Sequence, residues 1–229
     1  MSVGCQASEP QGGQPPSPLV SPPRLERTEL LIDGHDAHCR AVIVNNSYAL
    51  TAQHCVSDLS AARVLELRVR RCSPAGACDV SEADRIWVPC GRSPRSGIRG
   101  ADIALVHLTR PFSGGRVRHQ GLRLDETLFW SGDRAMVPYR PQRLVSGELI
   151  GPPATCAGDS GGALVDGQGQ LVAIASYASR PCGRGSSVFT LLEPWRASLS
   201  AAMSGGSPAA LCRLEQASGN SDRIEDRTR

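Results

Sequence analysis

The sequence predicts an all-β protein with two six-stranded antiparallel β-barrels packed together and a C-terminal helix. The chain has 229 residues, of which 24 are glycine and 17 are proline. Together the two types make about 18% of the chain, which exceeds their usual background of roughly 12%, so we expect many turns. Short apolar or alternating runs recur in two sets of six, and 40% apolar residues suffice for one large all-β domain or two small ones.

Each predicted strand is an apolar or alternating run bounded by turn residues. The first set covers residues 29 to 33, 40 to 45, 48 to 52, 63 to 70, 84 to 88 and 102 to 108. After a connection at 109 to 132, the second set covers 133 to 139, 143 to 150, 153 to 156, 162 to 166, 170 to 177 and 186 to 191. The third run of this set has the weakest pattern. Residues 191 to 203 predict a helix, since Glu193 and Pro194 suit its first turn.

The two ends of the chain differ in composition from the middle. Residues 1 to 27 are rich in proline and glycine and predict a disordered tether, and residues 213 to 229 predict a polar disordered tail. We therefore expect a folded unit at 28 to 212. Its first barrel covers about 28 to 110, its second about 131 to 192, and its helix about 192 to 203.

Charge and hydropathy exclude two classes of partner. The 25 basic residues are all arginine and are scattered along the chain. With 22 acidic residues the net charge is +3. Nucleic-acid binding needs a concentrated basic face, so we expect no nucleic-acid partner. No apolar run approaches the roughly 18 residues of a membrane span, and residues 1 to 18 lack the apolar core of a signal peptide. The chain as given is expected to be soluble.

Nine cysteines indicate an oxidising compartment, because cytosolic proteins of this size seldom carry so many. The cluster His35, Asp36, His38 and Cys39 resembles half of a metal site. No second ligand group follows at a matching spacing, so we expect no metal or other cofactor.

Three segments carry candidate chemistry: TAQHC ending at Cys55, ADIALVHL from Ala101, and CAGDSGGAL from Cys156. A serine hydroxyl is a poor nucleophile until a base takes its proton, so His54 is the candidate base for Ser160. A buried carboxylate fixes the imidazole tautomer and stabilises the imidazolium, and Asp102 lies between apolar neighbours. Each residue alone has an ordinary structural explanation, but their joint occurrence in this order favours catalysis. His107, His119, Asp36 and Asp58 lack such a context and are expected to be structural or exposed.

With these motifs the chain resembles the chymotrypsin-like serine peptidases of the trypsin fold over about residues 29 to 203. The resemblance implies a His54–Asp102–Ser160 triad, in which Asp102→Asn costs about 10⁴ in turnover. Gly158 and Gly161 allow a tight turn around the serine, so that the amides of Gly158 and Ser160 would form an oxyanion hole. The implied reaction is peptide-bond hydrolysis through an acyl-enzyme, without a cofactor.

The resemblance also implies two disulfides. Cys39 and Cys55 would close the histidine loop, and Cys156 and Cys182 would tie the serine loop to the wall of the substrate pocket. Four further cysteines, Cys72, Cys78, Cys90 and Cys212, allow three pairings. Of these we favour Cys72 with Cys78 and Cys90 with Cys212.

Cys5 remains unpaired at the head of the tether. A cysteine in that place resembles the lipidated residue of a mature bacterial lipoprotein, and a free thiol or a cloning boundary is the alternative. We expect an exported bacterial monomer with a protein or peptide substrate.

The resemblance assigns the substrate-binding residues to Ala154, Thr155, Ser176, Tyr177, Ala178 and Ser187. None carries a charge, so a buried Lys or Arg of the substrate would stay unpaired at a cost of several kcal/mol. Glutamate-specific relatives carry a histidine where this chain has Ala175. We therefore expect a small or medium apolar residue before the scissile bond.

The chain departs from the resemblance at Asp159, which in animal relatives pairs with a newly freed Ile or Val N-terminus. No such Ile-Val-Gly-Gly sequence lies upstream. The resemblance to bacterial relatives implies that an arginine of the second barrel, Arg134 or Arg140, neutralises Asp159 instead, so that activity needs no N-terminal processing. Two alternatives to a peptidase stay open: a catalytically silent binding or scaffold module, and an esterase with the same triad.

Overall fold

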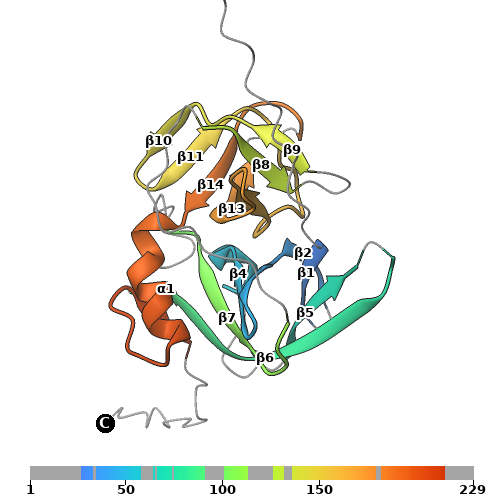
Figure 1. The fold of residues 1–229 in the computed structure, drawn as a ribbon, viewed down its shortest axis with the longest axis vertical. Helices are drawn as coiled ribbons and strands as arrows, with labels where there is room; N and C mark the ends of the chain where they lie inside the picture. Colours follow the sequence, from blue (N-terminus) through green and yellow to red (C-terminus); the bar gives the residue numbers. More distant parts are fainter. Residues whose placement is uncertain are drawn as a thin grey trace, which may run out of the picture.

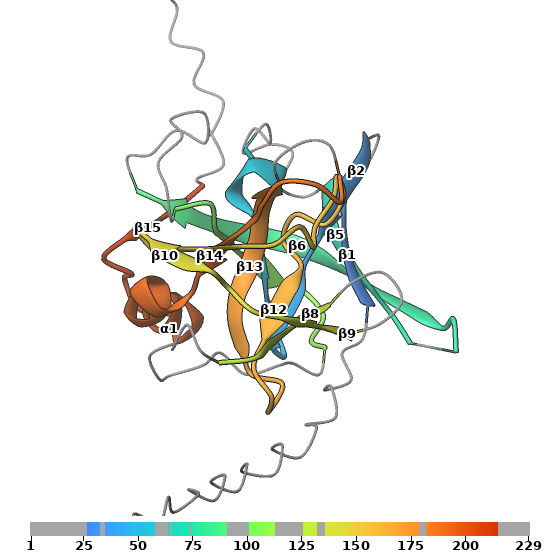
Figure 2. The ribbon, with the colours of Figure 1, turned by 90° about the horizontal axis from the view of Figure 1, so that it is seen from above.

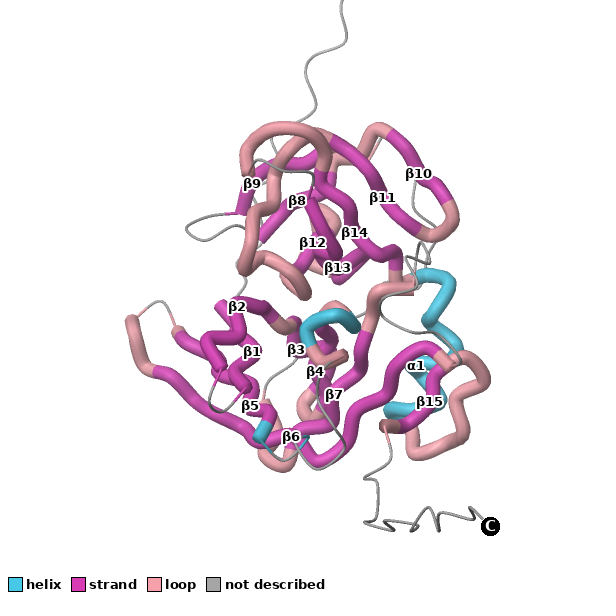
Figure 3. The backbone as a smooth tube through the Cα atoms, turned by 180° about the vertical axis from the view of Figure 1, so that it is seen from behind, coloured by secondary structure: helices cyan, strands magenta, loops and turns pink. Residues whose placement is uncertain are grey.

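The computed structural model describes residues 27–32, 35–57, 64, 66–73, 75–90, 101–112, 126–131, 136–178 and 182–214. It consists of two antiparallel sheets and one short α-helix, which confirms the predicted all-β class, although the sheets have eight and seven strands where six were predicted for each. The two halves lie one above the other, with strand β2 at the boundary between them (Figures 1 and 3). Within the described residues, no helix has the length and apolar content that a membrane crossing requires.

The first sheet has eight strands in the order β2-β1-β5-β6-β7-β4-β3, and β15 pairs with β6 outside this path. Its strands are β1 (Arg27–Ile32), β2 (His35–Arg40), β3 (Val42–Asn45), β4 (Tyr48–Thr51), β5 (Leu67–Cys72), β6 (Cys78–Pro89), β7 (Ala104–Leu108) and β15 (Leu211–Arg213). The long strand β6 extends with β5 away from the body of the molecule (Figure 2). A short 3-10 helix, η1 (Gln53–Cys55), follows β4 directly.

The second sheet has seven strands in the order β10-β11-β14-β13-β12-β8-β9. They are β8 (Leu128–Ser131), β9 (Met136–Tyr139), β10 (Arg143–Val145), β11 (Glu148–Gly151), β12 (Ala163–Val165), β13 (Leu171–Ala178) and β14 (Ser187–Leu191). The chain then forms the 3-10 turn η4 (Glu193–Trp195) and the helix α1 (Arg196–Met203). This agrees with the helix predicted at 191 to 203.

Alternating side chains bury three apolar clusters. One lies within each sheet, and the largest joins both sheets to the helix, since it includes Leu50 of the first sheet, Ile174 of the second and Leu199 of α1. Apolar burial at about 25 cal/mol per Å² is the main favourable term in folding. The packing between the halves is therefore continuous with the core, so the two sheets form a fixed frame for residues that lie between them.

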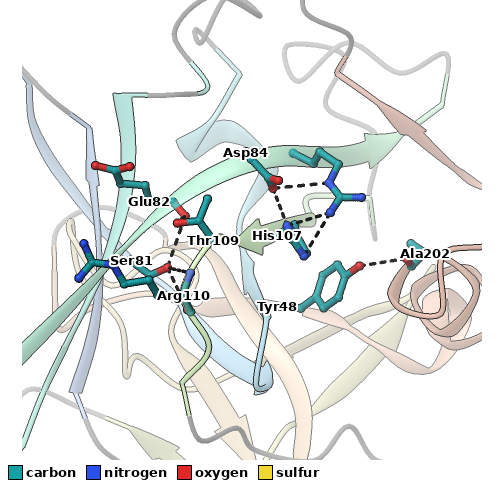
Figure 4. A network of polar contacts seen from close by, with 9 residues as sticks. Tyr48, Ser81, Glu82, Asp84, His107, Thr109, Arg110 and Ala202 are labelled. Atoms are coloured by element: carbon teal, nitrogen blue, oxygen red, sulfur yellow. Dashed lines mark hydrogen bonds and ion pairs between the residues drawn. The ribbon is translucent and has the colours of Figure 1, made fainter.

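A polar network attaches the helix to the first sheet (Figure 4). Tyr48 donates a hydrogen bond of 3.3 Å to the carbonyl of Ala202, and its ring meets the edge of His107. His107 in turn bonds to Asp84 and to the guanidinium of Arg85. His107 is thus structural, as the sequence predicted.

Four disulfides stabilise the fold: Cys39–Cys55, Cys72–Cys78, Cys90–Cys212 and Cys156–Cys182. All four match the predicted pairing. The Cys90–Cys212 bond fastens β15 to β6, where Cys212 also pairs with Val88 in the ladder. It closes the chain over 122 residues, whereas the Cys72–Cys78 bond closes a hairpin over only 6.

Three strand predictions were wrong in the second sheet. The run 128 to 131 forms β8, although it was assigned to a connection. The run 143 to 150 is a hairpin, because Ser146 (φ 50°) and Gly147 (φ 82°) form a two-residue turn with left-handed backbone. The run 153 to 156 makes no strand in the described structure, since Ala154 and Thr155 bond through their amides to a side chain instead of a ladder.

Several predictions fall partly or wholly outside the described residues. The tether at 1 to 26 with Cys5, the tail from residue 215 onward, Arg134, Asp58 and His119 belong to this group. Arg213 was assigned to the tail but pairs with Trp87 in the ladder of β15, and the Leu214 amide bonds to the Ile86 carbonyl. Strand β15 therefore extends past the predicted boundary at residue 212.

The two loop lengths predict unequal contributions to stability. Replacing Cys90 and Cys212 by alanine should lower the free energy of unfolding by about 5 kcal/mol, and replacing Cys72 and Cys78 by about 2 kcal/mol, because a longer loop gains more entropy in the unfolded chain. Urea unfolding of the two double variants measures both values. Equal losses would contradict the loop-closure explanation.

Candidate active site

His54 lies in η1 and is held by Asp102 at two points. Its main-chain amide donates to Asp102 Oδ1 at 2.9 Å, and its Nδ1 lies 2.8 Å from Asp102 Oδ2. Because Nδ1 is engaged, the proton of a neutral ring resides there and the lone pair resides on Nε2. The His54 side chain is 42% exposed, so the imidazole is only partly covered by the protein.

Asp102 precedes β7 between the buried residues Ala101 and Ile103. Its Oδ2 accepts a further hydrogen bond of 2.6 Å from the hydroxyl of Ser176 in β13. Burial acts to raise the pKa of Asp102, but the bonds from His54 and Ser176 outweigh it, so the pKa lies below its usual value. Asp102 is therefore an anion that links an element of each sheet.

The hydrogen bond between His54 and Asp102 also changes the pKa of the histidine. The pKa of His54 is raised above 6.5, chiefly by the hydrogen bond to Asp102, although burial acts in the opposite direction. The negative carboxylate stabilises the imidazolium, so His54 binds a proton more readily than a free imidazole. This arrangement suits a group that takes up a proton and later releases it.

Ser160 occupies a tight loop, residues 156 to 161, which we call the serine loop. Gly158 (φ 94°) and Gly161 (φ 83°) have the left-handed backbone that such a loop requires. A Cβ at Gly161 would lie 2.1 Å from the carbonyl oxygen of Arg40, so only glycine fits against β2. Within the loop, Asp159 donates its amide to the Cys156 carbonyl and accepts the Cys156 amide on Oδ2.

The serine hydroxyl is connected to His54 through other groups. Ser160 Oγ donates to the Ser176 carbonyl at 3.2 Å, and Ser176 Oγ donates to Asp102. A chain of bonds thus runs from His54 through Asp102 and Ser176 to Ser160. Among the described residues, no direct hydrogen bond joins the His54 ring to Ser160 Oγ.

The main-chain amides beside the hydroxyl are the candidate oxyanion donors. For Gly158 and Ser160, the described part of the chain provides no acceptor to either amide. The neighbouring amides of Asp159 and Gly161 are bonded, to the carbonyls of Cys156 and Ala175. Two N–H groups without an acceptor beside a serine hydroxyl can bind a negative oxygen.

Asp159 pairs with an arginine that the sequence analysis did not consider. Arg40 Nη2 lies 3.0 Å from Asp159 Oδ1, and both side chains are nearly buried. Arg40 ends β2 in the first sheet, whereas we predicted Arg134 or Arg140 of the second barrel. Arg140 is exposed, and the ion pair that the structure shows for Asp159 is with Arg40. No sequence signal marks Arg40, because the contact joins residues that are distant in the chain.

Ser187 holds the predicted wall of the substrate pocket together. Its hydroxyl accepts the amides of Ala154 (2.8 Å) and Thr155 (2.9 Å), and it shares a hydrogen bond of 2.9 Å with the Thr155 hydroxyl. Ser187 and Thr155 are both buried. These polar groups are satisfied within the protein, and the described residues Ala154, Thr155 and Ser187 bring no charge to the predicted wall.

Ser176, Tyr177 and Ala178 form the end of β13. On one side, Tyr177 pairs with Val188 and Ala178 with Ser187, while the pairing of β12 with β13 ends at Ala163 and Ile174. The Tyr177 side chain is 50% exposed. Ser176 also makes a contact that the sequence analysis missed, because its hydroxyl donates a hydrogen bond to Asp102.

The described residues contain one group with metal-ligand geometry, formed by Cys39, His54 and Cys55 within 4.8 Å. The two sulfur atoms are bonded to each other in a disulfide. They are not thiolates and cannot bind a metal as such, so this group does not fit a metal site.

The geometry predicts how the pKa of His54 responds to Asp102. In Asp102→Asn the negative charge is lost and one of the two acceptor oxygens becomes a donating amide, while the burial remains, so the pKa of His54 should fall from above 6.5 to below it. Titration of the ring protons by NMR measures both values. An unchanged pKa would show that the carboxylate does not act on the imidazole.

Comparisons with known proteins identify the family of the chain. The family model described as Trypsin matches residues 27–137 and 139–196. A solved structure of human heparin binding protein superposes with a TM-score of 0.62 at 16% identity, covering 80% of this chain and 92% of that one. The scabies mite inactivated protease paralogue S-D1 gives 0.62 at 14% identity, with coverage of 79% and 93%. At these identities the two structures support the fold alone, and no curated protein matches the sequence. The match over most of its length shows that the chain belongs to the trypsin family.

Proposed function

We propose that the protein is a serine endopeptidase that hydrolyses peptide bonds through an acyl-enzyme. The observation that carries this proposal is the Asp102 carboxylate, which bonds both to His54 Nδ1 and to the Ser176 hydroxyl beside Ser160. Family membership supports a serine peptidase-type hydrolase. The roles of the individual residues are our proposal.

In the proposed reaction, His54 acts as the base and Ser160 as the nucleophile. The Ser160 hydroxyl turns from the Ser176 carbonyl to His54 Nε2, which takes its proton as the serine oxygen bonds to the substrate carbonyl carbon. Imidazolium then gives the proton to the leaving amine as the C–N bond breaks. Water, deprotonated by His54, hydrolyses the ester and restores the serine. Asp102 stabilises the imidazolium in both halves.

The tetrahedral intermediates carry a negative oxygen, for which we propose the amides of Gly158 and Ser160 as donors. Removing one such donor typically costs about 10² to 10³ in turnover. The left-handed backbone at Gly158 supports this role, since it sets the direction of the peptide groups in the serine loop.

We propose that substrate lies along residues 176 to 178 as an added strand. The end of β13 pairs with β14 on one side and extends past the last pair with β12, which supports pairing with a peptide backbone. The residue before the scissile bond would then face Ala154, Thr155 and Ser187. Ser187 fills this region with its hydroxyl, which favours small or medium apolar side chains.

Two other functions are compatible with the same fold and the same site residues. One observation favours a binding module without catalysis: the Ser160 hydroxyl donates its hydrogen bond to the Ser176 carbonyl and not to His54. An esterase would share the triad and differ only in substrate, so comparing turnover of matched peptide and ester substrates separates it from a peptidase.

The four disulfides indicate an extracellular or otherwise oxidising location. We further propose an exported enzyme that works as a monomer on protein or peptide substrates. A lipid anchor at Cys5 remains a prediction, and an unmodified Cys5 in native protein, found by mass spectrometry, would end it.

Labelling with a fluorophosphonate tests catalysis directly. The wild-type protein should bind one probe at Ser160, because the probe needs an activated serine and an oxyanion site. Ser160→Ala should lose the label. Ser204→Ala, which removes an exposed serine at the end of α1, should keep it. Folded wild-type protein that takes no label would support the silent module.

Profiling with a peptide library tests the specificity. Alanine, valine, leucine or methionine should be preferred before the scissile bond, and arginine or lysine should be disfavoured by about 100-fold or more, since a buried cation would find no carboxylate. Cleavage is measured by mass spectrometry of the products. Preference for arginine or lysine would refute the proposed pocket.

A further inference from the structure

The strongest unassigned feature of the molecule is Arg40, a nearly buried arginine that crosses from the first sheet into the second. Its guanidinium contacts three groups of the second half. Nη2 bonds to Asp159 at 3.0 Å, Nη1 donates to the Ser131 carbonyl at 2.7 Å, and the guanidinium carbon lies 5.9 Å from the centre of the Trp130 ring. A planar guanidinium suits such a combination of carboxylate, carbonyl and aromatic contacts.

The main chain of Arg40 contacts the same loop. Its amide donates to the Ser160 carbonyl at 2.7 Å. Its carbonyl accepts the Thr51 hydroxyl at 2.8 Å and packs directly against Gly161. Arg40 therefore fixes the serine loop on both sides of the nucleophile, through the backbone of Ser160 and through the side chain of Asp159.

Asp159 transmits this contact to the candidate oxyanion amides. One carboxylate oxygen receives the Arg40 guanidinium and the other receives the Cys156 amide, while the Asp159 carbonyl accepts the Gly162 amide. Gly158 and Ser160 flank Asp159 in the chain, so the direction of their N–H groups depends on where this side chain is held. A nearly buried carboxylate without a cation would be driven toward solvent and would reorient the loop.

We infer that Arg40 is the positioning residue of the serine loop: its permanent charge holds Asp159, so that the oxyanion amides are set without a free N-terminal ammonium. A guanidinium keeps its charge over the whole pH range in which proteins are folded, whereas an α-amino group loses its proton near pH 8. The inference rests on the proposed function for its kinetic consequences, but its structural part can be measured without catalysis.

The first test compares Arg40→Met with Arg40→Lys in the full chain. Arg40→Met should lower kcat by about 10² to 10³, as for the loss of an oxyanion donor, with KM changed by less than about 3-fold. Arg40→Lys should recover kcat to within about 10-fold. Its activity should fall at alkaline pH as the lysine near pH 10.4 loses its proton, whereas wild type keeps its activity there. Arg40→Gln repeats the comparison if Arg40→Met does not fold.

The matched control is Arg85→Met. Arg85 is a partly exposed arginine that contacts Asp84, His107 and the Trp87 ring in the first sheet. Its loss removes an ion pair and a cation–π contact but should leave kcat within about 2-fold of wild type. Acetylation of the N-terminal amine of wild type should also leave kcat unchanged. A strict requirement for a free amine, or equal losses of kcat in the two methionine variants, would overturn the inference.

Hydrogen exchange separates this inference from the peptidase proposal. The amides of Cys156 and Asp159 are bonded within the serine loop, and both should exchange at least about 10-fold faster in Arg40→Met than in Arg85→Met. If wild type hydrolyses no substrate but the loop still loosens, the peptidase proposal fails and the role of Arg40 stands. If wild type is active and Arg40→Met changes neither kcat nor exchange, the role of Arg40 fails and the peptidase proposal stands.

Discussion

The arrangement of the candidate site depends on the carboxylate of Asp102. It accepts the main-chain amide and Nδ1 of His54 from the first sheet, and the hydroxyl of Ser176 from the second. A desolvated carboxylate would normally have a raised pKa, yet these donors keep the pKa of Asp102 low. Donors from both halves therefore stabilise this charge, and the site depends on the packing of the two halves against each other.

Arg40 makes a second polar connection across the same boundary. It carries a positive charge from β2 to the serine loop, whereas Asp102 presents a negative charge to β13. The apolar cluster between the sheets supplies the rigid frame, and these two charged groups set the positions of the loop and the imidazole. The fold as a whole contributes the stability, and few polar contacts contribute the geometry on which the proposed chemistry depends.

Local sequence patterns predicted most of the fold but not its long-range contacts. Alternating runs and turn residues predicted the all-β class, the terminal helix and most strands, and all four disulfides were predicted with the help of a family resemblance. The short run of β8 was missed because its apolar residues do not alternate. The hairpin at 143 to 151 was read as one strand, although the pair Ser146–Gly147 is a turn signal that could have revealed it.

In the candidate site too, local motifs were predicted from the sequence and long-range contacts were not. The segments around His54, Asp102 and Ser160 were recognised by residue type and order, and the structure joins His54 to Asp102 directly. Two contacts could not be predicted, because tertiary packing alone brings their residues together. The hydrogen bond from Ser176 to Asp102 joins residues 74 positions apart, and the ion pair of Arg40 with Asp159 joins residues 119 positions apart. Charge balance predicted that Asp159 needs a partner and the resemblance to bacterial relatives implied an arginine, but only the fold could identify Arg40.

The most direct measurement of the central claim is a crystal structure of the protein after reaction with a peptidyl phosphonate ester. A phosphorus bonded to Ser160 Oγ stands in for the tetrahedral carbon of the reaction. We expect one phosphonyl oxygen within hydrogen-bond distance of the amides of Gly158 and Ser160, with His54 Nε2 directed at the serine oxygen and Nδ1 still bonded to Asp102. An adduct whose oxygen faces solvent, with His54 directed away from the serine, would contradict the account.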